Sequence, residues 1–213
     1  MAIEKTLFTA ESYKGRAEEI YDYINTINDE FNIFSGITPE YSADNDNASV
    51  ITCTITNGGS IIIRTHSSNA NKPYQKTCDI NLNNGHVYSS DGSYNVSLAY
   101  YYGIKTSNGF YLGGSSATGH RGDFALSKNT DGTTTISFKK NDNYYIICPE
   151  KSLVYTPAIA SAGLSVFSPI PFDTAYSESM LFTPFSEYKD TVCTLTDSDG
   201  NNYFYDGYCA LKE

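Results

Sequence analysis

The sequence has no tryptophan, few charged residues (18%) and no long apolar run. Its N-terminal segment (MAIEKTLFTAESYKGRAEEI) is too polar for a cleaved signal peptide, which needs a basic start followed by an apolar core. No apolar stretch approaches the roughly 18 residues that a membrane-spanning helix requires. We therefore expect a protein that is made in a cytoplasm, carries no cleaved export signal and has no membrane partner.

Basic residues are scarce as well. The chain has 14 Lys and Arg against 24 Asp and Glu, a formal net charge of −10, and its densest basic pair is Lys139 and Lys140. Proteins that bind nucleic acid through the phosphates need clustered Lys and Arg side chains. The sequence therefore predicts no nucleic-acid partner.

Motifs for catalysis and metal binding are also missing. None of the three histidines lies in a nucleophile motif, and the five cysteines lack the CxxC or Cys/His spacing of zinc and redox sites. The cysteines are Cys53, Cys78, Cys148, Cys193 and Cys209. We expect reduced, mostly buried thiols, no catalytic residue, no metal ligand and no cofactor.

Three short segments look like ligand loops. GGSSATGHRG (113–122) is rich in glycine, but it lacks the Lys-Ser/Thr of a phosphate-binding loop and precedes an expected strand, which favours a surface loop. DNDN (44–47) and DSDGN (197–201) place oxygen ligands two residues apart, as calcium loops do, but neither has the closing glutamate. Turn formation is the favoured interpretation of both, and calcium binding stays open.

What the sequence does have is aromatic residues, 19 Tyr and 11 Phe, and a length of 213 residues that can bury a core. Between 11 and 31 the apolar positions alternate in steps of four and three, which predicts a helix with Thr9 or Ser12 as its cap. These positions are Tyr13, Ala17, Ile20, Ile24, Ile27 and Phe31. Packing on the protein's own sheet is favoured over a helix bundle with neighbouring subunits.

Short β-rich runs separated by Asn-Gly and Asp-Gly turns follow this helix. The runs at 50–56 and 60–66 flank an Asn-Gly turn and predict a hairpin. Further strands are expected at 77–82, 86–89, 94–102, 109–112, 123–127, 133–139 and 144–148. The fold class is therefore mainly β, an antiparallel β-sandwich or barrel with one N-terminal α-helix, a Pro-rich arm and a C-terminal β-meander.

The same pattern divides the chain into four parts. They are an N-terminal helical extension (1–36), an antiparallel β body (48–148), a Pro-rich arm (149–190) and a C-terminal meander (191–213), all expected within one compact unit. The arm holds most of the prolines, which lack the amide donor of a central strand. We expect the arm to wrap the body or reach a neighbour.

The C-terminal segment from Ser168 carries a family resemblance. Its matching residues are Phe182, Thr183, Pro184, Tyr188, Asp199, Gly200, Tyr203, Gly207, Ala210 and Leu211. With this spacing the segment resembles the C-termini of structural proteins from the tail and baseplate regions of bacteriophages and phage-like particles of Firmicutes and gut bacteria. The resemblance implies a non-enzymatic virion protein, and it brings no catalytic residues with it.

The expected function is thus a structural role in a phage tail, baseplate or neck, with other virion proteins and copies of the same chain as partners. The candidate interface residues are Ile20, Ile24, Ile27, Phe182, Phe185, Tyr203, Tyr205 and Tyr208. One alternative is a receptor- or glycan-binding module at a tail tip, with a host-surface glycan stacked on the tyrosines of 100–102 and 144–145. A second alternative is a capsid decoration protein. A third, which is less favoured, is a cell-wall hydrolase that uses an unidentified pair of carboxylates.

Overall fold

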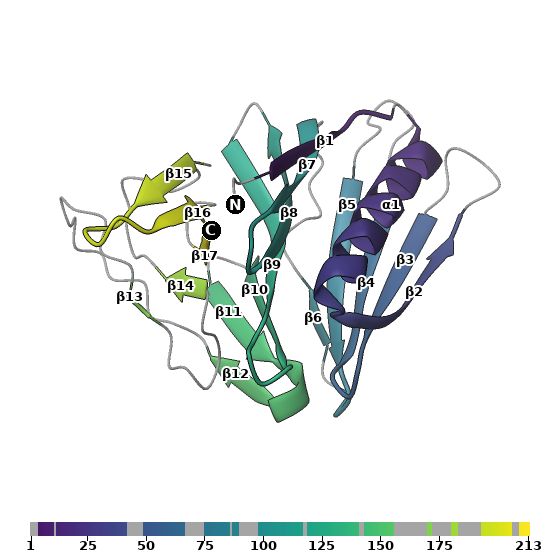
Figure 1. Cartoon of the computed structure of the whole chain (residues 1–213). Helices are drawn as coiled ribbons and strands as arrows, with labels where there is room; N and C mark the ends of the chain where they lie inside the picture. The colour runs from purple at the N-terminus through teal and green to yellow at the C-terminus, as the bar shows by residue number, and fades with distance from the viewer. Residues whose placement is uncertain are drawn as a thin grey trace.

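The computed structural model of the chain contains one α-helix, one short 3-10 helix and three antiparallel sheets in its described part (Figure 1). The residues it describes are 4–10, 12–41, 49–66, 75–85, 87–89, 98–116, 119–140, 143–155, 170–171, 180–182, 193–205 and 209–213. The expected mainly β class with one N-terminal helix is confirmed. Within these residues every sheet has two edge strands, so none of them closes into a barrel.

The largest sheet has seven strands in the order β1-β7-β8-β9-β10-β11-β12. Their bounds are β1 (Glu4–Phe8), β7 (Leu98–Lys105), β8 (Gly109–Ser116), β9 (Gly119–Lys128), β10 (Thr134–Lys140), β11 (Asn143–Cys148) and β12 (Leu153–Tyr155). A short 3-10 helix, η1 (Pro149–Lys151), joins the last two. β8 pairs with β9 as far as Ser116 and Gly119, so most of the segment 113–122 is strand. The prediction of a surface loop over this segment is therefore wrong.

A second sheet of five strands has the order β2-β3-β4-β5-β6. Its strands are β2 (Phe34–Glu40), β3 (Ser49–Ile55), β4 (Gly59–His66), β5 (Gln75–Leu82) and β6 (Val87–Ser89). The predicted hairpin is confirmed as β3 and β4, with Asn57 in the left-handed region at φ 59°. This sheet continues directly from the helix, because β2 begins three residues after the helix ends.

Helix α1 (Tyr13–Phe31) begins at Ser12, whose hydroxyl accepts a hydrogen bond from the Gly15 amide at 3.0 Å. It ends at Asn32, which adopts the left-handed conformation of a C-cap. The helix covers the second sheet and lies beside β1 of the first (Figure 1). Its apolar face and the facing sides of both sheets form one core.

Ile20, Ile24 and Ile27 are at most 1% exposed in that core. The hypothesis that these three side chains contact other subunits is therefore wrong for this structure, because the protein's own sheets already cover them. The favoured alternative, packing on the body, is confirmed.

The C-terminal sheet has five strands in the order β13-β14-β17-β16-β15. They are β13 (Ile170–Pro171), β14 (Met180–Phe182), β15 (Cys193–Thr196), β16 (Asn202–Tyr205) and β17 (Cys209–Lys212). The segment expected as a Pro-rich arm (149–190) thus supplies two strands to this sheet, besides β12 of the seven-stranded sheet. Its Pro171 lies on the edge strand β13, where a missing amide donor costs little, and the central β14 contains no proline.

The N-terminal segment also differs from the expected extension. β1 pairs with β7 from Glu4 to Phe8, so residues that were expected outside the body form one edge of its largest sheet. Figure 1 shows the seven-stranded sheet between the other two, with the C-terminal strands in yellow and green on the side away from α1.

Candidate functional site

A groove of about 440 Å³ lies between β1 and α1, and we call it the β1–α1 groove. Its lining residues are Glu4, Thr6, Leu7 and Phe8 of β1, Glu19, Asp22, Tyr23, Thr26 and Ile27 of α1, and Lys105 of β7. This volume lies within the range of small-ligand sites in proteins. The groove is therefore large enough to accept a side chain or a small molecule.

Strand and helix run in opposite directions along this groove. Glu19 accepts hydrogen bonds from the Ala10 amide at 3.0 and 3.1 Å, just after β1. The Phe8 and Tyr23 rings meet edge to face with centroids 5.4 Å apart. Glu4, at the start of β1, pairs with Lys105 in the register of the sheet. The groove therefore follows almost the whole length of β1.

Lys105 is the basic residue of the groove, and Glu30 holds it. Its Nζ lies 2.5 Å from a Glu30 carboxylate oxygen and 4.0 Å from one of Glu4. The hydrogen bond to Glu30 is the main cause that raises the pKa of Lys105, against a smaller opposite effect of burial. Arg16 in turn lies 3.8 Å from Glu19, so the carboxylates of Glu4, Glu19, Asp22 and Glu30 face only two basic groups and the groove is acidic.

The base of the groove is aromatic. Tyr23 packs against Phe8 and against Phe110 of β8, whose centroid is 6.3 Å away. Burial raises the pKa of Tyr23 well above its ordinary value, with a smaller effect of Glu4. Its hydroxyl oxygen is buried and has no hydrogen-bond partner among the described residues. This tyrosine therefore stays neutral and acts as a packing group.

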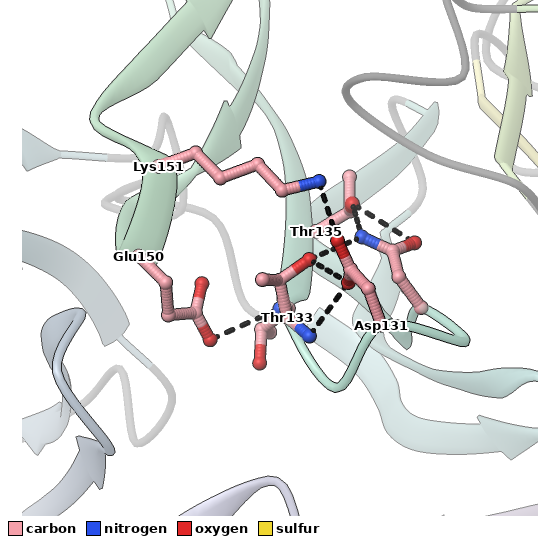
Figure 2. Close-up of polar contacts among 7 residues, drawn as sticks. Asp131, Thr133, Thr135, Glu150 and Lys151 are labelled. Atoms are coloured by element: carbon pink, nitrogen blue, oxygen red, sulfur yellow. Dashed lines mark hydrogen bonds and ion pairs between the residues drawn. The ribbon is translucent and has the colours of Figure 1, made fainter.

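A second polar cluster fastens the turn between β9 and β10 to η1 (Figure 2). Asp131 accepts from the Thr133 hydroxyl at 2.6 Å and from its amide at 3.0 Å, and Lys151 Nζ lies 2.8 Å from the other carboxylate oxygen. These hydrogen bonds, led by the one from Lys151, hold the pKa of Asp131 well below its usual range. Glu150 accepts from the Thr134 amide at 3.0 Å. Both carboxylates thus hold backbone in place.

Cys148 ends β11 beside this cluster and is fully buried. Burial is the main cause that raises the pKa of its thiol, so the reactive thiolate is disfavoured. Cys53 is equally buried, and like Cys148 it is a thiol outside any disulfide. The expectation of reduced, buried thiols is confirmed for these two, and the side chains of Cys78, Cys193 and Cys209 lie outside the described ones.

The DSDGN segment forms the turn between β15 and β16. Asp197 accepts from the amides of Asp199 and Asn201, from the Asn201 side chain and from the Tyr203 hydroxyl, each at 2.9 Å. The Asn201 side chain contributes most to lowering the pKa of Asp197 to about 2. The turn interpretation is confirmed here, whereas DNDN at 44–47 lies outside the described residues.

The remaining interface candidates are only partly placed. Tyr203 is 3% exposed and turns its hydroxyl to Asp197. The backbones of Phe182 and Tyr205 lie in β14 and β16, while Phe185 and Tyr208 lie outside the described residues. Of the proposed glycan platform, Tyr145 stacks on the core residue Phe138 with centroids 5.2 Å apart.

The acidic groove was missed at the level of sequence. Glu19, Asp22 and Thr26 follow one another at steps of three and four, so the sequence does show a polar stripe on one helix face. The partner strand β1 gave no signal, because EKTLF is short and half polar. When β1 is not recognised, this polar stripe on the helix looks like an ordinary solvent-exposed face.

Within the described residues no group of three or more His, Cys, Asp or Glu has a geometry that would hold a metal ion. In the same part of the chain, α1 is not apolar enough to cross a membrane. Comparison of the sequence with protein-family models gave no match, and neither did comparison with curated proteins or with solved structures.

Proposed function

We propose that this chain is a non-enzymatic structural protein of a phage or phage-like particle, a component of the tail, baseplate or neck that acts through contacts between subunits. In this proposal the protein resides in the virion, and its partners are other virion proteins and copies of itself. The proposal starts from the C-terminal resemblance.

The way the C-terminus is held is the observation that supports the proposal most. β17 lies in the middle of its sheet, between β14 and β16. Phe204 of β16 packs on Tyr111 of β8 with ring centroids 5.0 Å apart, and both residues are buried. Asn108 donates to the carbonyls of Lys212 and Glu213 at 3.1 and 3.2 Å. The described strands of the segment that carries the resemblance are thus paired with one another and held against the body by β8 and Asn108.

The use of acidic side chains supports a role without catalysis. Asp131 and Asp197 hold turns, while Glu19 and Glu150 accept from backbone amides. Each of these carboxylates is engaged in keeping the backbone in place, a role that suits a protein whose task is to present rigid surfaces.

The test is to locate the protein in particles. Particles purified from a strain that carries the gene should contain the chain at a fixed ratio to the tail-tube protein, measured by quantitative mass spectrometry. Gold-labelled antibodies should decorate one position along the tail. Deleting the gene should give particles without that structure. Absence of the chain from intact particles, with normal particles formed by the deletion strain, would overturn the proposal.

A further inference from the structure

The two faces of β1 differ in what they meet. Thr6 pairs with Gly103, and the face of Gly103 that would carry a Cβ lies against the Tyr23 ring of α1. Since side chains alternate along a strand, Glu4, Thr6 and Phe8 point toward α1, while Lys5 and Leu7 point to the other face of the sheet. Leu7 is 52% exposed, the larger of two such values among the large apolar side chains of the described residues.

β1 is also an edge strand. In the described part of the chain it has β7 on one side and no strand on the other, so one row of its amide and carbonyl groups faces away from the sheet. Such a row is a template on which an extended segment can add a further strand. Four of the five β1 residues are exposed, which leaves this edge accessible.

The groove lies next to that edge. A strand added beside β1 would direct every second side chain toward α1, at intervals of about 6.7 Å. Along α1, Asp22 and Thr26 are four residues apart, which corresponds to about 6 Å at 1.5 Å per residue. Successive side chains on that face of an added strand would therefore meet Asp22 and then Thr26.

From this arrangement we propose that the β1–α1 groove and the open edge of β1 form a docking site for an extended, basic segment of another protein. The segment adds a strand to β1, places Lys or Arg side chains in the groove and places apolar side chains beside Leu7. Charge complementarity selects this occupant, because the groove and the groups that pair with its lining hold four carboxylates (Glu4, Glu19, Asp22 and Glu30) against two basic groups, Arg16 beside Glu19 and Lys105 beside Glu4 and Glu30. The acidic chain, with a net charge of −10, would also attract a basic partner from a distance.

This docking surface would bind its segment whether or not the protein belongs to a particle. The probe is a synthetic peptide of eight residues in which lysine and valine alternate, with a glutamate–valine peptide as the matched comparison. Binding is followed by fluorescence anisotropy of the labelled peptide and by amide shifts of the full-length protein in two-dimensional NMR. We expect shifts at Leu7 and Thr26 with the lysine peptide and none with the glutamate peptide.

Two further measurements separate charge from strand addition. Raising the ionic strength from about 0.01 M to about 0.15 M shortens the Debye length from about 30 Å to about 8 Å and should weaken binding severalfold. N-methylation of the peptide amides along one edge removes donors, and of the two possible edges only one should abolish binding. Equal loss from both edges, or none, would argue against an added strand.

The test variant is Asp22→Lys, and its matched control is Glu40→Lys at an exposed residue of the edge strand β2, which makes the same change in charge elsewhere. Asp22→Lys should lower the affinity for the lysine peptide about tenfold or more, whereas Glu40→Lys should leave this affinity unchanged. Circular dichroism checks that both variants fold. The proposal would be overturned if the two variants had equal effects or if both peptides bound equally well. It would also be overturned by NMR shifts at Leu7 that depend on protein concentration in the absence of peptide, because these would indicate a second copy in the site.

Discussion

Gly103 of β7 lies directly beneath the ring of Tyr23. A Cβ on Gly103 would come within 2.7 Å of the Tyr23 hydroxyl oxygen and closer still to two ring carbons. The ring in turn fills the space between Phe8 and Phe110. The absence of a side chain at position 103 therefore lets α1 approach the seven-stranded sheet.

Gly103→Ala should destabilise the protein by about 1–3 kcal/mol, because the added methyl group overpacks a dense contact. Urea denaturation measures the change in the free energy of unfolding. Gly36→Ala in β2 is the control, since a Cβ there would meet nothing within 4 Å. Equal stability of the two variants would show that Tyr23 can move at little cost.

Ile24→Ala tests the assignment of the helix to the protein's own core. Ile24 is fully buried, so its truncation should cost about 2–5 kcal/mol of unfolding free energy. The cost should be the same at every protein concentration, because the covering residues belong to the same chain. Leu7→Ala, at an exposed apolar residue, should change the stability of the isolated protein by less than about 0.5 kcal/mol. If the effect of Ile24→Ala on stability depended on protein concentration, the hypothesis that this helix face contacts another subunit would be supported again.

The helix and its cap could be predicted because they depend on local pattern. The 3.6-residue period of buried positions and the hydroxyl of Ser12 act within one segment. The β3–β4 hairpin was equally local, since its Asn-Gly turn determines which strands pair. Strand β2 was missed because Gly36 and Pro39 weaken the strand signal, and Pro39 is tolerated because β2 is an edge strand.

The candidate site could not be predicted, because it joins segments that are distant in the sequence. The groove needs β1, α1 and β7, and Glu4 meets Lys105 only after the register of β1 on β7 is set. The helix positions of Glu19 and Asp22 were visible in the sequence, but the strand that faces them was not. Pairing between remote strands depends on tertiary packing, which a local pattern does not contain.

Asp197→Asn should alter how stability depends on pH. The pKa of Asp197 is lowered to about 2 in the folded state, against about 3.9 in an unfolded chain. Its contribution is therefore present above about pH 4 and is lost as the pH falls toward 2. The variant should be less stable than the wild type near neutral pH, and the difference should shrink between about pH 4 and pH 2, as measured by urea midpoints.

Asp199→Asn is the control for this series, since it makes the same change in charge in the same turn without removing the acceptor. Tyr203 provides a second readout. Its pKa is raised to about 12, first by burial and then by the hydrogen bond to Asp197. Asp197→Asn should lower this value in an NMR titration. An unchanged pH profile together with an unchanged Tyr203 titration would remove the assigned role of the carboxylate.

The cysteines should respond to labelling in two stages. Cys53 and Cys148 are fully buried and form no disulfide, so a thiol reagent should modify them slowly in the native protein. After unfolding without reductant, mass spectrometry should find five labels per chain, one for each cysteine. Fewer than five labels would indicate a disulfide and contradict the expected redox state.

The last prediction concerns the C-terminal sheet. Deleting Tyr203–Glu213 removes β17 and most of β16, the strands that link β14 to β15. It also removes the Phe204 ring from Tyr111 and the carbonyls that Asn108 binds. The core formed by α1 and the two other sheets does not include these residues. We expect part of the truncated protein to stay soluble and rich in β-structure by circular dichroism, but to be absent from purified particles.

Point variants distinguish two roles of the C-terminal sheet: packing on the protein's own body and contact with another subunit. Phe204→Ala should lower the unfolding free energy by about 3–5 kcal/mol, because a buried ring is lost, whatever the particle does. Tyr205→Ala combined with Tyr208→Ala should weaken incorporation into particles about as much as the deletion does. If the truncated chain still assembles into normal, infectious particles, the C-terminus is neither a lock nor an interface. The balance would then move to a free-standing binding module, because the one segment that resembles virion proteins would be dispensable for building the virion.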